Sequence, residues 1–276
     1  MAAPRVTVVV VTRDRGPELG RSLPHHADLP VIVIDNDSSD DSAAVARASG
    51  ARVEQLRHNA GAAGRNLGVE LARTPYVAFA DDDSWWAPGA LDRAVAILDL
   101  HPELALVAAR VLVGEQGRTD AVCLAMSVSP LPPTAAGPQV LGFLACGAVV
   151  RREAFLQVGG FSSRYETGGE EGLLALDLAA AGYQLAYVHD VVAHHHPSSR
   201  RRPSHRRVVE ARNALWTVWL RRPVASGLAA AARATRTSDG RAGLLAALSG
   251  MRWVVADRRR LPPDVEELAA RLARQY

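Results

Sequence analysis

The sequence predicts an α/β fold, built on a doubly wound, mostly parallel sheet and followed by a helical extension. Short apolar runs rich in β-branched residues alternate with segments of helical pattern along most of the chain. Aspartate-rich turns follow two of these runs directly. After Arg222 and Pro223 the chain becomes rich in alanine, leucine and arginine. We therefore expect a main domain over residues 1–222 and a helical extension over residues 223–276.

The individual elements follow from residue type and periodicity. Strands are expected at Val6–Val11, Val31–Ile34, Arg52–Leu56, Tyr76–Ala80, Phe143–Val150 and Tyr187–Ala193. Helices are expected at Ser39–Ser49, Gly61–Ala72, from Pro88 onward, at Arg152–Val158 and at Leu173–Ala181. Residues 114–137 contain several prolines and are expected to form a loop.

The composition is that of an ordinary globular protein, with 276 residues, 48% hydrophobic and 22% charged. No window of 18 apolar residues is present and no signal peptide is recognisable, so we expect neither a transmembrane helix nor secretion. Cys123 and Cys146 fit no metal-binding spacing and are expected to be reduced, buried thiols of a cytoplasmic protein. The chain has no lysine, which excludes Schiff-base chemistry and a phosphate-loop lysine.

Charge is divided unevenly along the chain. Residues 1–196 contain 15 arginines and 23 acidic residues, whereas residues 197–276 contain 17 arginines and six acidic residues. This asymmetry predicts two different partners. We expect the Arg-rich C-terminal region, including Arg200–Arg202, to contact phosphate groups of the donor, a lipid-phosphate acceptor or the surface of an anionic membrane. A solvated basic surface is the alternative; nucleic acid is not expected, because no recognition module is present.

An acidic triplet is the sharpest local signal for a binding site. Asp81, Asp82 and Asp83 directly follow an expected strand, and in open α/β sheets ligands bind outside the carboxyl ends of strands. Three adjacent carboxylates repel one another unless a cation is present. Oxygen ligands of this kind suit Mg²⁺ or Mn²⁺ that is also bound by substrate phosphates. A solvated acidic turn is the alternative for the triplet taken alone.

Six segments, in order, resemble glycosyltransferase family 2. They are VTVVVVTRDR, VIVIDNDSSDDS, NAGAAGRNLGVELA, YVAFADDDSWWAPGAL, VVRREAFLQVGGFSSRYETGGEEGLLALDLAAAGY and VHDVVAHHHP, and they cover roughly residues 6–222. Each pattern is weak alone, but their common order is specific. The resemblance implies the GT-A fold and an inverting, metal-dependent transfer of a sugar from a nucleotide-sugar donor to an acceptor hydroxyl.

The resemblance also implies roles for single residues. It assigns to the nucleotide-sugar pocket Thr12, Asp35, Asp37, Arg65, Asp81 and Asp82. It assigns to the Mn²⁺ or Mg²⁺ site Asp81, Asp83 and His194, with His195 and His196 as loop residues. It implies a UDP-, GDP- or dTDP-sugar as the donor. The acceptor stays open, with lipid-linked molecules and small natural products as candidates.

The catalytic pair implied by the resemblance is Glu170 and Glu171, of which Glu171 matches the general base. The family commonly has aspartate at the second position, so the carboxylate here reaches one methylene further. The helix that follows is more apolar than in the family, at Leu173–Leu176, which suggests an unusual acceptor surface.

Two other functions are alternatives to sugar transfer. A nucleotidyltransferase also combines an α/β nucleotide fold with metal-binding carboxylates, but residues 12–15 lack the glycine cluster that such enzymes carry after the first strand. A nucleotide-sugar binding protein without catalysis is the second alternative. Intact carboxylates at Asp83 and Glu171 argue against it.

Overall fold

The computed structural model describes residues 3–198 and 203–274, so Arg200–Arg202 lie outside the described residues. The strands are β1 (Val6–Thr12), β2 (Val31–Asp35), β3 (Arg52–Gln55), β4 (Tyr76–Asp81), β5 (Ser84–Trp86), β6 (Leu104–Val113), β7 (Arg118–Thr119), β8 (Ala148–Arg151) and β9 (Gln184–His195). The helices before α8 are α1 (Gly16–Ser22), α2 (Ser42–Ala48), α3 (Gly64–Leu71), α4 (Ala90–Leu100), α5 (Ala121–Ser127), α6 (Arg152–Gln157) and α7 (Glu170–Ala180). Short 3₁₀ turns lie at η1 (Leu23–His26), η2 (Gly61–Ala63) and η3 (Ala145–Gly147).

One sheet runs through the main domain in the order β3-β2-β1-β4-β8-β6-β9-β5, and β7 pairs with β6. The first four strands in this order are parallel, as are β6 and β9. Strand β8 lies antiparallel between β4 and β6, and β5 lies antiparallel to β9. The expected α/β fold is confirmed, and its sheet is mixed beyond β4.

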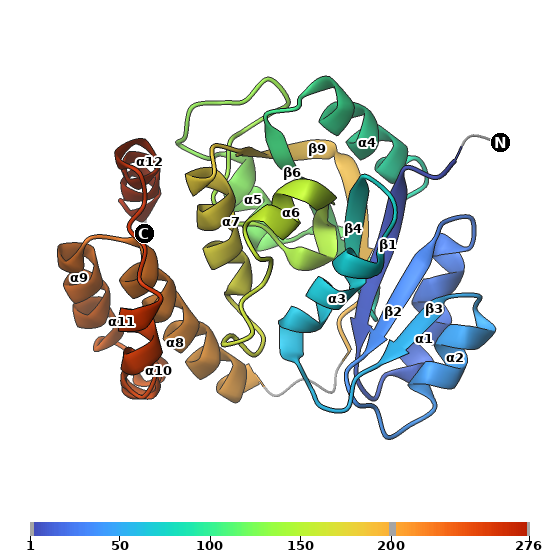
Figure 1. Cartoon of the computed structure of the whole chain (residues 1–276), viewed down its shortest axis with the longest axis horizontal. Helices are drawn as coiled ribbons and strands as arrows, with labels where there is room; N and C mark the ends of the chain where they lie inside the picture. Colours follow the sequence, from blue (N-terminus) through green and yellow to red (C-terminus); the bar gives the residue numbers. More distant parts are fainter. Residues whose placement is uncertain (1–2, 199–202, 275–276) are drawn as a thin grey trace.

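Apolar side chains cover both faces of the sheet, because strand residues alternate between them. On one face Val9 and Phe79 pack with residues of α3, α6 and α7. On the other face Val8 and Ala78 pack with residues of α1, α2 and α4. Three layers result, and the strands β1 and β2 run toward the lower edge of the molecule in Figure 1.

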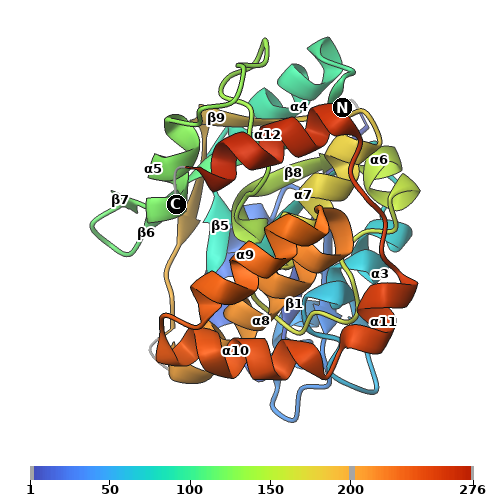
Figure 2. The same cartoon turned by 90° about the vertical axis from the view of Figure 1, so that its left-hand side faces the viewer.

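The C-terminal helices are α8 (Pro203–Arg221), α9 (Val224–Ala234), α10 (Ser238–Leu248), α11 (Met251–Ala256) and α12 (Pro263–Ala273). Helices α9 to α12 lie within the expected extension, residues 223–276. These helices stack beside the main domain, and α9 and α10 lie on the face toward the viewer in Figure 2. Trp216 of α8 donates its indole N–H to the carbonyl of Ala247. An ion pair between Arg221 and Asp177 joins α8 to α7. The C-terminal helices are therefore fixed to one another and to α7 by packing and by charge.

The apolar residues at the start of α7 are explained by this packing. Leu174 packs toward the sheet, Leu173 packs against α8, and Leu176 packs against α12. All three are nearly inaccessible to solvent. The expectation that Leu173–Leu176 form an acceptor surface is wrong, because the sheet, α8 and α12 cover these side chains.

Several elements differ from the expectations. Strand β6 was not expected, although its run of apolar residues is visible in the sequence. Helix α5 lies inside the expected loop, and β9 continues two residues beyond the expected end. Cys123 and Cys146 are buried and unbridged, as expected. Within the described part of the chain, no helix is both long and apolar enough to cross a membrane.

Candidate active site

A large cavity of about 1350 Å³ opens at the edge where β1, β2 and β4 end. Its wall includes the turns after these strands, residues 143–146, the loop 163–171 and the first half of α8. Acidic and basic side chains both line it, among them Arg65, Asp81 and Glu171. Several of the residues that the sequence assigned to the site line this cavity.

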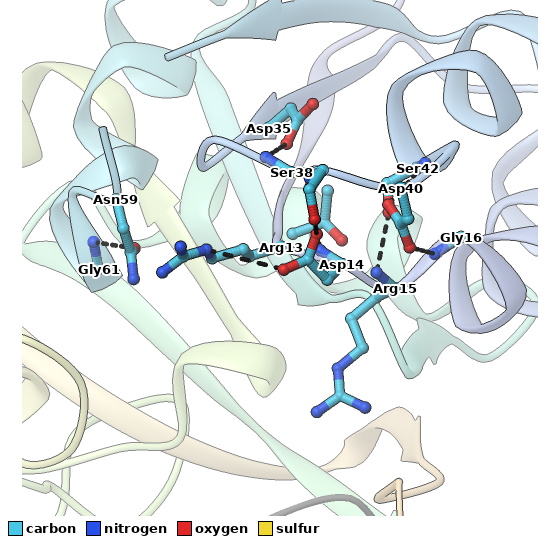
Figure 3. Close-up of polar contacts among 12 residues, drawn as sticks. Arg13, Asp14, Arg15, Gly16, Asp35, Ser38, Asp40, Ser42, Asn59 and Gly61 are labelled. Carbon is cyan, nitrogen blue, oxygen red and sulfur yellow. Dashed lines mark hydrogen bonds and ion pairs between the residues drawn. The ribbon is translucent and has the colours of Figure 1, made fainter. Parts of the chain in front are cut away.

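The turns after β1 and β2 hold one another through polar contacts (Figure 3). Asp35 is fully buried, and its carboxylate accepts hydrogen bonds from the backbone N–H of Ser38 and from the side chain of Gln55. Asp14 has a positive φ of 53° and accepts the N–H of Ser39. Asp37 has a positive φ of 65° and is exposed. Asp35 thus stabilises the turn after β2 through hydrogen bonds of its buried carboxylate.

Asn36, which the sequence analysis did not single out, lines the cavity, whereas Asp35 is not among its lining residues. The amide of Asn36 donates to the carbonyl of Gly61 at 2.9 Å and accepts the N–H of Ala60 at 3.3 Å. Asn36 therefore fixes the turn before α3 against the turn after β2. A polar residue directly after a strand, beside Asp35, was the available signal.

Asp81, Asp82 and Asp83, the strand-end cluster, lie between β4 and β5. Thr12 donates a hydrogen bond to the Asp82 carboxylate at 3.2 Å. Burial, together with the charges of Asp83 and Asp81, raises the pKa of Asp82 to about 7. The cluster therefore holds more negative charge than its protein surroundings neutralise, which favours a bound cation.

His195 belongs to a group of three side chains that could hold a metal ion. One ligand atom from each of Asp81, Asp83 and His195 lies within 4.8 Å of the others. The Nε2 atom of His195 is 3.2 Å from Oδ1 of Asp83. Carboxylate oxygens and an imidazole nitrogen form a donor set that suits a divalent ion.

His194 does not take the expected position in this group. Because β9 continues through His195, the side chains of His194 and His195 point to opposite faces of the strand. The ring of His194 stacks on Trp85, with ring centroids 5.6 Å apart. His195 is therefore the histidine beside the carboxylates, and its place in a strand was the feature that the sequence pattern did not reveal.

Glu170 and Glu171, the helix-start pair, begin α7 after Gly169, whose positive φ of 84° brings the loop to the helix. Glu170 is 3% exposed and accepts the N–H of Gly168 at 2.5 Å. Glu171 lines the cavity. Burial and the neighbouring charge of Glu170 raise the pKa of Glu171 to about 7, opposed by backbone N–H groups and Arg65.

Arg65 lies between the two acidic groups. Its guanidinium binds Asp81 at 2.6 Å and lies 4.0 Å from Glu170. Burial opposes its charge, but the carboxylates of Asp81, Glu170 and Glu171 raise the pKa of Arg65 above its ordinary value. Arg65 is thus a permanent buried cation that holds the strand-end cluster and the helix-start pair together.

Two further arginines line the cavity from the turn after β1. Arg13 lies 3.9 Å from Asp14, and the guanidinium of Arg15 donates to the hydroxyl of Ser198. Figure 3 shows the side chain of Arg15 extending away from the contacts that its backbone makes. Guanidinium groups at this edge offer hydrogen bonds to an anionic ligand.

The chain is similar in sequence to curated glycosyltransferases. The chain is 28% identical over 268 residues to the pre-mycofactocin glycosyltransferase of Mycobacterium tuberculosis. This match covers 91% of the chain but 52% of the relative, so the chain spans about half the length of the curated relatives it matches.

Two solved structures have a similar fold. The mannosyltransferase PcManGT from Pyrobaculum calidifontis, in complex with GDP-Man and Mn²⁺, has a TM-score of 0.62 at 21% identity, covering 99% of this chain and 75% of that one. TarS from S. aureus, in complex with UDP-GlcNAc, has a TM-score of 0.58 at 18% identity, covering 78% and 66%. These similarities confirm the expected GT-A fold. The model of the family described as glycosyl transferase family 2 matches residues 7–159, and the chain belongs to that family.

Proposed function

We propose that the chain transfers a sugar from a nucleotide-sugar donor to an acceptor hydroxyl, with inversion of the anomeric centre. The observation that carries this proposal is the presence of two distinct carboxylate groups in one cavity, bridged by Arg65. One group is paired with a histidine, and the other begins a helix. A single displacement needs both a cation-binding group at the leaving diphosphate and a base at the acceptor.

In the proposed reaction the acceptor hydroxyl oxygen attacks the anomeric carbon of the donor sugar. The Glu171 carboxylate accepts the hydroxyl proton. The bond between the anomeric carbon and the diphosphate oxygen breaks, and its electron pair leaves with the nucleoside diphosphate. Because there is one attack from the side opposite the leaving group, the configuration is inverted.

Asp81, Asp83 and His195 are the residues that would hold the divalent ion. Their ligand atoms lie close together, and the pKa of Asp82 is raised by burial and by the negative charges of Asp83 and Asp81, which a cation would offset. When bound, the ion supplies positive charge to the diphosphate leaving group. The imidazole in the set favours Mn²⁺ over Mg²⁺, which prefers oxygen ligands. Mn²⁺ and GDP-Man occur together in the structure of PcManGT.

We propose that the donor nucleotide lies along the turns after β1 and β2. Thr12 and Asp82 bound this part of the cavity, while Asp35 and Asp37 shape the turn around Asn36. Arg13 and Arg15 offer guanidinium groups to the diphosphate. Arg65 was expected in the nucleotide pocket; its contact with Asp81 supports instead a role in balancing the charge of both acidic groups.

The acceptor side is proposed to lie next to Glu171, along an apolar wall. The backbone of Ala145 favours the ionised form of Glu171, and Phe143 and Leu144 line the cavity beside Ala145. Val122 of α5 also contributes to the lining. These side chains favour an acceptor whose reactive hydroxyl adjoins an apolar surface.

A donor screen tests this function. The chain is mixed with Mn²⁺ and UDP-, GDP- or dTDP-sugars, and thermal stability and release of nucleoside diphosphate are measured in parallel. A true donor is expected to raise the melting temperature by mass action and to release its diphosphate slowly in water and faster with an acceptor. A donor that stabilises the fold without any release under all conditions would identify a binding protein without catalysis.

We also propose that residues 1–222 form the transferase domain and that residues 223–276 form its helical extension. The turn at Arg222 and Pro223 supports a boundary there, because α9 begins at Val224. Limited proteolysis tests the boundary: cleavage is expected near residue 223 before it occurs inside either part. If the protease cleaved first within α8, the domain boundary would lie before residue 222.

A further inference from the structure

The outer surface of the extension combines exposed apolar side chains with arginines. Helix α9 packs on α8 where Gly227 meets Trp219, and α10 packs on α8 where Gly243 meets Ala211. Helices α9 and α10 also contact each other, and Figure 2 shows both on the side that faces the viewer. We call their sides turned away from α8, together with the turn between them and the exposed side chains of α11, the outer face.

The outer face is unusually apolar for exposed surface. Leu228 of α9 is 69% exposed and Leu245 of α10 is 71% exposed. Other large apolar side chains in the same part of the chain are also solvent-accessible, namely Val224, Leu248 and Val255. Single exposed leucines are ordinary, but a group on adjacent helices indicates a surface that meets a partner.

The charge around these residues is positive. Residues 224–260 contain seven arginines and two aspartates. Arg233, Arg236 and Arg252 are exposed, and among the described residues none of the three forms an ion pair with a carboxylate. By contrast, Arg221 and Arg222 bind acidic residues of α7 and α12. The inner arginines therefore hold the helices together, whereas the outer ones are available to an anionic partner.

We propose that the outer face docks onto an anionic lipid surface. Leucines would enter the headgroup boundary while arginines contact lipid phosphates, as in helices that lie in the plane of a membrane. A second copy of the chain fits less well, because a symmetric contact would bring two arginine-rich faces together. A nucleic acid would leave the leucines uncovered. The proposal goes beyond sugar transfer and does not depend on it.

Vesicle sedimentation tests the docking with the full chain. The wild type is expected to bind vesicles of phosphatidylcholine mixed with phosphatidylglycerol, and to bind pure phosphatidylcholine much more weakly. Binding should fall as salt rises, because exposed charges are screened. Equal binding to both vesicle types, or binding that is insensitive to salt, would overturn the proposal without any variant being needed.

Matched variants assign the binding to the outer face. The double change Leu228→Ser and Leu245→Ser is expected to lower partitioning at least about tenfold, since two leucines lose burial in lipid. Leu100→Ser is the control, because Leu100 is 76% exposed at the end of α4, in the main domain. This control should bind as the wild type does. Unchanged binding of the double variant would overturn the proposal.

A second pair of variants separates local from overall charge. Changing Arg233, Arg236 and Arg252 to Ser should weaken binding to anionic vesicles by roughly 10²-fold, at about fivefold for each arginine. The control alters the same net charge in the main domain, at Arg21, Arg57 and Arg73. Equal losses in the two triple variants would show that net charge alone drives binding and would overturn the assignment.

Sedimentation velocity distinguishes self-association. The wild type is expected to be the same species as the leucine double variant in solution without lipid. A wild-type dimer that the double variant dissociates, with vesicle binding unaffected, would assign the outer face to a second copy and overturn the proposal. Circular dichroism is expected to show native helix content in every variant, because all the altered side chains are exposed.

Discussion

The strand-end cluster and the helix-start pair contain the same kind of side chain, yet their surroundings differ. Asp81, Asp82 and Asp83 are adjacent in a turn between two strands, so their charges accumulate. Glu170 and Glu171 begin α7, where the unpaired N–H groups of the helix favour negative charge. The first arrangement calls for a cation, and the second supports a carboxylate that gains and loses a proton.

Arg65 makes the contrast sharper. It forms a close ion pair with Asp81 but lies 4.0 Å from Glu170. The positive charge of Arg65 therefore stabilises the carboxylate of Asp81 more than that of Glu170. Glu171 keeps a raised pKa despite it, because burial outweighs the attraction. Position within the fold, rather than residue type, separates the proposed roles.

The largest effect is expected from Glu171→Gln, which keeps the size of the side chain but removes its ability to accept the proton. Turnover should fall by roughly 10²–10⁴, the range for a positioned general base. Glu171→Asp should retain part of the activity. Initial rates of sugar transfer under saturating donor measure both. Wild-type turnover in Glu171→Gln would place the base elsewhere.

Asp83→Asn is expected to lower turnover by roughly 10³-fold, because charge stabilisation at the leaving diphosphate is lost. EDTA should abolish wild-type activity, and Mn²⁺ should restore it in the wild type but not in the variant. Asp92→Asn, in the first turn of α4, is the matched control and should leave turnover unchanged. Full wild-type activity in EDTA would contradict the role of the strand-end cluster.

The pH profile should report the helix-start pair. Because Glu171 must be ionised to act and its pKa is raised to about 7, kcat should fall below about pH 7 and level off above it. Glu170→Gln removes a neighbouring negative charge, so the midpoint should move to lower pH, with at most about a tenfold change in the plateau. If Glu170→Gln left the midpoint of the pH profile unchanged, the charge of Glu170 would not influence the pKa of Glu171.

The smallest effect concerns stability. A carboxyl group whose pKa is raised by folding destabilises the fold at pH values above that pKa and has no such effect below its unfolded value. Glu171→Gln should therefore raise the free energy of unfolding at pH 8 by on the order of 1–3 kcal/mol, but little at pH 4. Urea unfolding at the two pH values measures the difference. An equal change in the free energy of unfolding at pH 8 and at pH 4 would show that the ionised carboxylate of Glu171 does not destabilise the fold.

Much of the first half of the fold could be predicted from the sequence, because Val6–Thr12 and its neighbouring strands are continuous apolar runs. The aspartates at Asp81–Asp83 were predictable for the same reason, since they directly follow such a run. The later strands were harder. An antiparallel partner such as β8 is set by contacts distant in sequence, with Val149 opposite Val107.

The histidine beside the carboxylates is His195, whereas the sequence pattern pointed to His194. A run of three histidines carries no information about which face each one occupies unless the strand's end is known. Strand β9 pairs with β5, and Trp85 lies opposite His194 in that register. This pairing turns His195 toward Asp83. The face of each histidine was therefore decided by tertiary pairing and not by the motif.

Calorimetric titration of the donor's nucleoside diphosphate tests the division of roles most directly. It would be carried out on the wild type, Asp83→Asn and Glu171→Gln, each with Mn²⁺ and with EDTA. The wild type and Glu171→Gln are expected to bind equally with Mn²⁺ and at least about tenfold more weakly in EDTA, whereas Asp83→Asn is expected to bind weakly in both. If Glu171→Gln lost Mn²⁺-dependent binding as Asp83→Asn does, the two carboxylate groups would form one site and the account would be contradicted.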